Sequence, residues 1–295
     1  MKKMLFVMNP YAGTRKANRH LADILALFNR AGYTVTAHMT AGPGDGAQVV
    51  ARYAAEMDAI VCCGGDGTFN ETINGILRSG ADVPIGYIPA GSTNDFAASL
   101  HLPTDVMKAA QAIVEGQPRR YDIGLFDQRY FSYVASFGAF TKASYATPQS
   151  FKNALGHTAY VLSGIQELSQ LRNTHMRLEV DGEIIEDDFL FGAISNSTSV
   201  GGILTLDPKQ VDMQDGKFEV FLIRTPKDVL ELSECILALQ SQKYNCNAIT
   251  FRSASHVRIC GNEEVVWTLD GERADVRGPV EVQNIHHAIS VLQKG

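Results

Sequence analysis

Apolar residues in the first part of the chain alternate between the two-residue period of strands and the longer period of helices. The spacing of Leu21, Leu25 and Phe28, for example, predicts a helix, whereas the unbroken run 59–63 predicts a buried strand. Strands that alternate with helices form a parallel sheet whose two faces are both covered by helices. We therefore expect an open α/β sheet. The predicted strands are 4–8, 33–39, 59–63 and 84–88, and the predicted helices are 16–31, 45–57, 68–77 and a short one after 91–94.

Beyond residue 120 strand-like stretches dominate the pattern, which predicts an antiparallel β-sandwich. Turn signals such as Asp181-Gly182 and Asp215-Gly216 separate some of these stretches. The predicted strands are 121–126, 130–137, 175–180, 189–195, 218–223, 248–252, 256–260, 265–268 and 281–283, with helices at about 153–171 and 227–240.

The two patterns divide the chain into two predicted domains. We expect an α/β domain over 1–120 and a β-sandwich domain over 121–286, and we expect the apolar end of the chain, 287–295, to return to the first domain as a strand. The length of 295 residues is consistent with two domains.

Composition narrows the class of protein. The formal net charge of −6 argues against a nucleic-acid partner. No apolar run reaches the roughly 18–20 residues that a membrane-spanning helix needs. The 5 cysteines are an odd number, and Cys62 and Cys63 are adjacent in a predicted strand, so reduced thiols in the cytoplasm fit best.

The stretch Gly64-Gly65-Asp66-Gly67-Thr68 follows a predicted strand and opens a predicted helix. Backbone N–H groups converge on an anion at such a turn, and glycine lets the backbone approach a phosphate closely. Asp66 would repel phosphates unless a metal ion lies between them, and Mg²⁺ bridges carboxylate and phosphate oxygens. The alternative is an ordinary turn in which Asp66 caps the helix.

Two further loops occupy the same place after other predicted parallel strands. Asn9-Pro10-Tyr11-Ala12-Gly13 follows the first strand, and 89–96, with the sequence PAGSTNDF, follows the fourth. The carboxyl ends of parallel strands share one edge of the sheet, where the ligands of open α/β sheets bind. We therefore expect the three loops to gather in one crevice.

These motifs closely resemble those of the diacylglycerol kinase catalytic-domain superfamily, and best of all its soluble bacterial lipid kinases. The resemblance covers essentially the whole chain. It rests on Asn9-Pro10-x-Ala12-Gly13, Gly64-Gly65-Asp66-Gly67-Thr68-x-Asn70-Glu71, Pro89-x-Gly91-x-x-Asn94-Asp95-Phe96-Ala97, Tyr121-Asp122-Ile123-Gly124, Leu155-Gly156-x-x-Ala159-Tyr160, Asn196-x-x-x-x-Gly201-Gly202, Asp215-Gly216 and Leu269-Asp270-Gly271-Glu272. NAD kinases share a GGDGT element but lack the Asn-Glu that follows it here.

The resemblance implies a nucleotide site in the first domain, a lipid-substrate site in the second, and positions for metal ions. Asp66, Asp95 and Asp122 match the residues that hold a water and magnesium network, and Asp215 matches a structural magnesium position to which the backbone near Asp212 and Lys217 contributes. The residues implied to bind ATP are Asn9, Pro10, Gly13, Arg15, Lys16, Thr40, Gly64, Gly65, Asp66, Gly67, Thr68, Asn70, Glu71, Gly91, Thr93 and Asn94.

Asp270 matches the proposed general base of the family, and Glu272 lies beside it as a second candidate proton acceptor. Phosphoryl transfer depends on alignment and charge neutralisation, with a carboxylate assisting the attacking hydroxyl. The alternative is that Asp270 only forms a hairpin turn, as we expect for Asp181 in Asp181-Gly182-Glu183. We expect His286 and His287 to be surface or half-buried residues rather than metal ligands.

The resemblance implies an ATP- and Mg²⁺-dependent kinase that phosphorylates the hydroxyl of diacylglycerol to give phosphatidic acid. Such a protein would be cytoplasmic, would visit the inner membrane surface, and could be a homodimer. We interpret the helix 153–171 as packing at the domain junction rather than as a membrane contact flanked by Lys142, Lys152 and Arg172. Two alternatives stay open: a kinase of another hydroxyl substrate, such as a sphingoid base, another lipid alcohol or a nucleotide, and a catalytically silent regulator that binds nucleotide or lipid.

Overall fold

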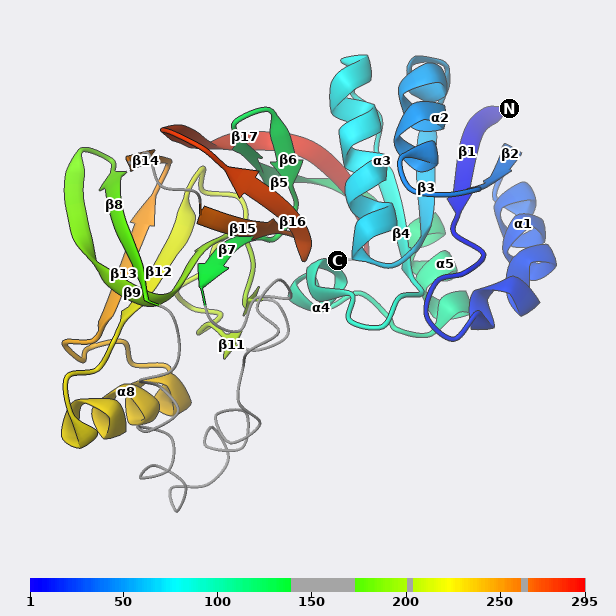
Figure 1. Cartoon of the computed structure of the whole chain (residues 1–295). Coiled ribbons are helices and arrows are strands. Elements are labelled where there is room, and N and C mark those ends of the chain that lie inside the picture. Colours follow the sequence, from blue (N-terminus) through cyan, green and yellow to red (C-terminus); the bar gives the residue numbers. More distant parts are fainter. Residues whose placement is uncertain (139–172, 201–203, 261–264, 295) are drawn as a thin grey trace. The chain divides into compact units, whose positions relative to one another are not determined.

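The computed structural model describes residues 1–138, 173–200, 204–260 and 265–294 (Figure 1). The expected helix 153–171, its flanking Lys142, Lys152 and Arg172, and the motif residues Gly201 and Gly202 lie outside these ranges. Among the residues that the structure describes, no helix combines the length and apolar character that crossing a bilayer requires.

The chain forms two compact units. The first unit comprises Met1–Ile123 together with Ile285–Gly295, and the second comprises Gly124–Asn284. Strands β5 (Gln117–Phe126) and β17 (Val280–Gln293) carry the chain from one unit to the other. The sequence suggested a short strand at 281–283 and a separate apolar run at the end, but β17 is one continuous strand over both.

The first unit is built on a parallel sheet with the strand order β2-β1-β3-β4-β17. Strands β1, β2, β3 and β4 pair in parallel throughout, and β17 joins β4 in parallel at Val291 and Ile85. The predicted parallel α/β sheet is thus confirmed. Its first four strands are β1 (Lys2–Met8), β2 (Tyr33–Met39), β3 (Ala59–Gly64) and β4 (Ile85–Pro89).

Helices cover both faces of this sheet because its inner strands β1, β3 and β4 are apolar on both faces. Met4, Phe6 and Met8 of β1 join the core that α1 and α5 cover, and neighbouring residues such as Leu5 point away from that core and are also buried. Helices α2 and α3 pack against each other (Figure 1). The helical elements are η1 (Lys16–His20), α1 (Leu21–Arg30), α2 (Asp45–Tyr53), η2 (Ala54–Glu56), α3 (Asp66–Ser79), α4 (Asp95–Ser99) and α5 (Val106–Glu115).

The described strands of the second unit pair only antiparallel, which confirms the β-rich C-terminal part. Trp267 is fully buried in the core of this unit and stacks at a tilt on Phe126 and Phe137. The elements are β6 (Arg129–Phe131), β7 (Val134–Gly138), β8 (Thr174–Val180), β9 (Glu183–Ser195), β10 (Ser199–Val200), β11 (Leu204–Thr205), β12 (Phe218–Arg224), α8 (Val229–Ser241), β13 (Ile249–Ala254), β14 (His256–Cys260), β15 (Val265–Leu269) and β16 (Glu272–Val276).

All 5 cysteines are unpaired in the structure, as the sequence suggested. Cys62 and Cys63 are buried in β3, and burial raises the pKa of both thiols, that of Cys63 to about 12. Because the thiolate is the reactive form, these two side chains act as small core residues.

Candidate functional site

The three loops expected to converge lie against one another at the carboxyl edge of the parallel sheet. The N–H of Asn9 donates to the carbonyl of Cys63 at 2.9 Å, and the N–H of Ala90 donates to the carbonyl of Gly64 at 2.7 Å. A Cβ atom added to Gly91 would lie 2.5 Å from the Cα of Gly65. Only glycine at position 91 allows this approach, so the loops form one surface rich in backbone N–H groups.

The first loop bends sharply at Gly13, where φ is +48° and a Cβ atom would lie 2.4 Å from the carbonyl oxygen of Ala90. The side chains of Arg15 and Lys16 follow this bend and are exposed. The Arg15 guanidinium lies 5.3 Å from the ring centroid of Tyr11, and Pro10 accepts a hydrogen bond from the side chain of Asn18. Two cations therefore stand next to the loop surface, where phosphate charge could be neutralised.

Asp66 is the first residue of α3, and its N-cap is Gly65. The Asp66 carboxylate accepts a hydrogen bond from the N–H of Phe96 at 3.4 Å, so it reaches across to the third loop. Asp95 precedes Phe96 and is almost fully buried. Two carboxylates thus stand beside the converging loops, a donor set suited to Mg²⁺.

Asn94 fixes the shape of the third loop. Its backbone has φ of +55°, which asparagine tolerates better than most residues. Its side-chain oxygen accepts a hydrogen bond from the N–H of Gly91 at 2.9 Å, and its side-chain nitrogen donates to the carbonyl of Gly91 at 3.1 Å. Thr93 is exposed beside it.

Glu71 of α3 holds the loop after β2, and Thr40 ties the start of this loop to β1. The Glu71 carboxylate accepts hydrogen bonds from the N–H groups of Gly44 and Gly46 at 2.7 and 3.0 Å, at the beginning of α2. This arrangement satisfies donors at a helix N-terminus and complements the helix dipole. Thr40 is buried, and its N–H donates to the carbonyl of Met8.

Three further candidates, Gly67, Thr68 and Asn70, lie on α3 and differ in what they contact. Asn9 donates from its side chain to the Thr68 hydroxyl at 3.4 Å, which links the first loop to α3. Asn70 accepts a hydrogen bond from the side chain of Asn74 at 2.8 Å, within the helix. Gly67 is exposed in the first turn. The side chains of Asn9 and Thr68 are therefore joined in the structure, whereas that of Asn70 bonds along α3.

Asp122 on β5 is fully buried in the first unit. Its Oδ1 atom accepts a hydrogen bond from the N–H of His287 at 2.7 Å and lies 3.0 Å from Nδ1 of His286. From the sequence we expected the two histidines to be surface or half-buried residues rather than metal ligands. Their rings are exposed, but both residues bond to this buried carboxylate.

In the second unit Asp212, Asp215 and Lys217 form one loop before β12. The Asp212 carboxylate accepts from the N–H of Gln214 at 3.0 Å, and that of Asp215 accepts from the N–H of Lys217 at 2.9 Å. The carbonyl of Lys217 accepts a hydrogen bond from the side-chain nitrogen of Asn284 at 2.9 Å. Both carboxylates are exposed and stand on a loop whose backbone is held in place.

Two buried oxygen atoms near this loop have no hydrogen-bond partner among the described residues: Oε2 of Glu219 and Oδ1 of Asn284. Burial and then the charges of Asp215 and Asp212 raise the pKa of Glu219 to about 8. Buried unsatisfied acceptors are costly, and a cation would satisfy them. Sequence reasoning missed Glu219, although a single glutamate in the apolar run Phe218–Arg224 was a signal that could have identified it.

Asp270 lies in a two-residue turn between β15 and β16, where Asp270 and Gly271 both have positive φ. Its carboxylate accepts hydrogen bonds from the N–H and hydroxyl of Ser132 at 2.6 and 2.8 Å, and from the N–H groups of Tyr133 and Val134 at 3.0 and 3.1 Å. Burial raises the pKa of Asp270, and these hydrogen bonds oppose the shift. Asp270 therefore anchors the turn to the segment 132–134.

The turn at Asp181 and Gly182 has the same form, with φ of +45° and +89°, and is a hairpin as expected. Asp181 also accepts backbone hydrogen bonds, from Ser255 and His256, but it is exposed whereas Asp270 is buried. Glu272 is exposed beside Arg129, with 3.7 Å between Oε2 and Nη2. The turn geometry alone therefore does not mark Asp270 as a catalytic residue, and burial is what distinguishes it.

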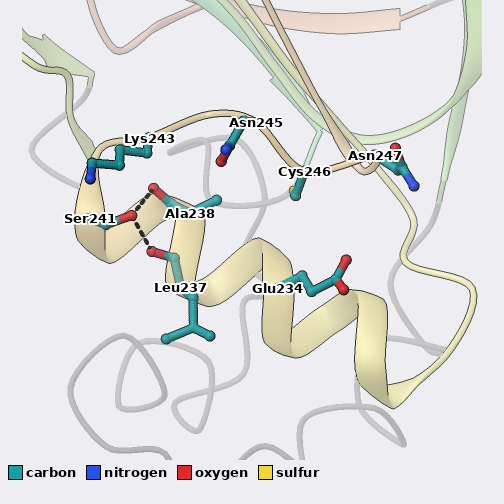
Figure 2. A pocket seen from close by; sticks show the side chains of 8 residues that line it. All are labelled: Glu234, Leu237, Ala238, Ser241, Lys243, Asn245, Cys246 and Asn247. Carbon is teal, nitrogen blue, oxygen red and sulfur yellow. Dashed lines mark hydrogen bonds between the residues drawn. The ribbon is translucent and has the colours of Figure 1, made fainter.

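A cavity of ≈ 350 Å³ lies between the C-terminal half of α8 and the segment after it (Figure 2). Figure 2 shows the Ser241 hydroxyl bonded back to the carbonyls of Leu237 and Ala238, at 2.7 and 3.4 Å. None of the residues that line this cavity is a predicted site residue, so the cavity is not part of the candidate site.

Comparison with known proteins matches both parts of the chain. Residues 3–126 match the model of the diacylglycerol kinase catalytic domain, and residues 134–293 match that of the YegS C-terminal NAD kinase beta sandwich-like domain. A crystal structure of a diacylglycerol kinase from Bacillus anthracis has a TM-score of 0.75 at 20% identity, covering 99% of this chain and 97% of that chain. At this identity the likeness concerns the fold.

Relatives that match over most of their length are also named diacylglycerol kinases. The chain is 33% identical over 294 residues to a diacylglycerol kinase of Bacillus subtilis, covering 99% of this chain and 96% of the relative. It is 32% identical over 274 residues to a diacylglycerol kinase of Staphylococcus carnosus, covering 92% of this chain and 89% of the relative. The chain therefore belongs to the diacylglycerol kinase catalytic-domain family of lipid kinases.

Proposed function

We propose that the protein is an ATP- and Mg²⁺-dependent kinase that transfers the γ-phosphoryl group to the hydroxyl of diacylglycerol and forms phosphatidic acid. The observation that carries this proposal is the contact among the three loops, which joins backbone N–H groups, the exposed Arg15 and Lys16, and the carboxylates of Asp66 and Asp95. Phosphoryl transfer needs this combination of positioning and charge neutralisation. The name of the relatives supplies the acceptor class.

The first unit would bind the nucleotide. Backbone N–H groups of the loop Gly64–Thr68 would hold phosphate oxygens, and Arg15 and Lys16 would neutralise their charge. Asn9 and Thr68, whose side chains are joined, would orient the nucleotide at the first loop. Thr40, Asn70, Glu71, Thr93 and Asn94 would shape the rest of the site, and the contacts of Glu71 and Asn94 with neighbouring loops fit a supporting role for these two.

The residues present fit Mg²⁺ at two places. Asp66, Asp95 and Asp122 would hold it near the phosphates, where it would offset their negative charge. Asp215 and the backbone near Asp212 and Lys217 would hold a structural ion. The unpartnered buried oxygens of Glu219 and Asn284 support the second place, because a cation near this loop would compensate their burial.

Proton transfer from the lipid hydroxyl would fall to the turn that contains Asp270 and Glu272. The Asp270 carboxylate already accepts four hydrogen bonds, which occupy its lone pairs. Glu272 is exposed and follows directly on this rigid turn. We therefore assign the proton-accepting role to Glu272, and to Asp270 the role of holding the turn in place.

A diacylglycerol acceptor would bring the enzyme to a membrane surface. We propose a peripheral protein of the cytoplasm that visits the inner membrane surface and, by analogy with the family, forms a homodimer. The second unit would present the lipid site.

The decisive experiment is transfer of labelled phosphate from ATP to a panel of lipids in mixed micelles, with and without Mg²⁺. The panel contains diacylglycerol, monoacylglycerol, a sphingoid base and ceramide. We expect Mg²⁺-dependent labelling of diacylglycerol at the highest kcat/KM. Preferred labelling of a sphingoid base would show that this lipid, and not diacylglycerol, is the substrate. ATP binding without transfer to any lipid would identify a catalytically silent regulator.

A further inference from the structure

A cluster of three possible metal ligands lies on β5 and β17, away from the converging loops in sequence. It consists of Asp122, His286 and His287, and their ligand atoms all lie within 4.8 Å of one another. All three residues belong to the first unit. The carboxylate is fully buried and both imidazoles are exposed. An ion from solution could therefore reach the imidazoles and meet a buried negative charge.

The backbone brings the two imidazoles to the same side of β17. Neighbouring residues of a regular strand point to opposite faces, but His287 has φ of +53°, a left-handed conformation that is uncommon for histidine. The two rings consequently stack, with centroids 3.7 Å apart and an interplanar angle of 25°. This local irregularity of β17 turns a pair of adjacent histidines into two possible ligands for one ion.

The carboxylate joins the pair through one oxygen atom. Oδ1 of Asp122 lies 3.0 Å from Nδ1 of His286 and accepts the backbone N–H of His287 at 2.7 Å. The ligand atoms of a tetrahedral Zn²⁺ ion, at bonds of about 2.1 Å, lie about 3.4 Å apart. The observed separation of 3.0 Å needs to widen by only a few tenths of an ångström, which rotation of the exposed His286 ring allows.

We propose that Asp122, His286 and His287 bind a divalent transition-metal ion of the zinc class. Two imidazole nitrogens and one carboxylate oxygen suit Zn²⁺, Co²⁺ and Ni²⁺, whereas Mg²⁺ prefers a shell of oxygen ligands. Three protein ligands leave a coordination position for water. The bound ion would link β5 to β17, and binding to the folded state alone stabilises that state.

This proposal goes beyond the kinase function and does not depend on it, although it shares Asp122 with the proposed magnesium network. Its test therefore measures metal binding and thermal stability rather than phosphoryl transfer. Loss of lipid kinase activity would leave these measurements unaffected, and an active kinase without the transition-metal site would refute only this proposal.

The experiment titrates the full-length, chelator-treated protein with Co²⁺, followed by its visible absorption, and with Zn²⁺, followed by calorimetry. The variants are His286→Asn, His287→Asn and the double variant. Asparagine is chosen because it tolerates the left-handed backbone at position 287. The control is His175→Asn, which alters an exposed histidine that also contacts two carboxylates, Asp188 at 2.9 Å and Glu186 at 3.4 Å.

We expect the parent and the His175→Asn variant to bind one ion per chain with equal affinity, unaffected by millimolar Mg²⁺. Each single variant at position 286 or 287 should bind at least tenfold more weakly, and Zn²⁺ should raise the Tm of the parent but not of the double variant. Absence of binding by the parent, equal affinity of the double variant, or displacement of Co²⁺ by Mg²⁺ would each overturn the proposal.

Discussion

At the scale of single residues, Glu219 is an unusual side chain among the described residues of the second unit. It is a buried carboxylic acid in the apolar strand β12, one of its oxygens has no hydrogen-bond partner among the described residues, and its pKa is raised to about 8 from an ordinary value of 4.5. Burial contributes most to this shift, followed by the charges of Asp215 and Asp212. Its ionised form is therefore costly unless a cation is near.

The shift gives a pH dependence with a definite sign. Between pH 4.5 and about 8 the folded state keeps a proton on Glu219 that the unfolded state has lost. The free energy of unfolding therefore falls as the pH rises through this window, and the loss is complete above pH 8. We expect Glu219→Gln to be more stable than the parent at pH 8 in the presence of a chelator, by on the order of 2 kcal/mol, and close to it at pH 4.5.

Urea denaturation at several pH values between 4.5 and 8 measures this difference. Glu56→Gln, which alters an exposed glutamate, is the control. Added Mg²⁺ should narrow the gap at pH 8, because an ion at the loop containing Asp215 offsets the buried charge. Parallel stability curves for the parent and Glu219→Gln over the whole range would show that the carboxylate carries no such cost.

At the scale of elements, the three loops form one surface because their backbones touch. A Cβ atom at Gly91 would lie 2.5 Å from Gly65 Cα and 2.8 Å from the side-chain oxygen of Asn94. The backbone of Gly65 cannot give way as a flexible side chain can, so Gly91→Ala must separate the second and third loops. We expect ATP affinity to fall at least tenfold and the free energy of unfolding to fall by about 1–3 kcal/mol.

Equilibrium titration with ATP and thermal unfolding measure both effects. Gly42→Ala is the matched control, since it lies in the neighbouring loop and an added Cβ there meets nothing within 4 Å. If Gly91→Ala bound ATP as tightly as the parent, the contact between the second and third loops would not be needed for nucleotide binding.

The same elements show how far sequence reasoning reaches. The strand Tyr33–Met39 was predicted with its observed bounds, because apolar periodicity and glycine stops are local signals. Helix α5 was missed, since small residues such as Ala109 and Ala110 make up much of its buried face. Strand β16 was missed because only Ala274 and Val276 of its five residues are buried. Both elements become recognisable only through the neighbours against which they pack.

The candidate site also has features that the sequence predicts and features that it does not predict. The convergence of the loops after β1, β3 and β4 follows from a general property of parallel sheets, so it could be expected from the motifs alone. The four hydrogen bonds on Asp270 could not be, because their donors lie between 136 and 138 residues away along the chain. Which strands become neighbours decides such contacts, and no local pattern contains that information.

At the scale of the whole molecule, the proposed tasks are divided between the two units. The loops proposed to bind ATP belong to Met1–Ile123, and the turn with Asp270 and Glu272 belongs to Gly124–Asn284. Substitutions in the second unit should therefore change turnover without changing nucleotide affinity, because the converging loops do not depend on the second unit for their backbone contacts.

Glu272→Gln tests this division most directly. The side chain is exposed, so the substitution should leave stability within about 0.5 kcal/mol of the parent. General base assistance contributes about 10²–10⁴-fold, so we expect kcat for lipid phosphorylation to fall at least about 100-fold while the Kd of ATP stays within about twofold. Asp181→Asn, in the matching hairpin turn, should retain full turnover.

Asp270→Asn separates the two carboxylates of the turn. The substitution replaces one acceptor oxygen of the carboxylate with an NH2 donor, so at least one of the hydrogen bonds from Ser132, Tyr133 and Val134 is lost, and we expect lower stability together with reduced turnover. If Asp270→Asn abolished turnover at unchanged stability while Glu272→Gln stayed active, Asp270 would be the proton acceptor. If ATP affinity fell in step with turnover in either variant, the division of labour between the two units would be wrong.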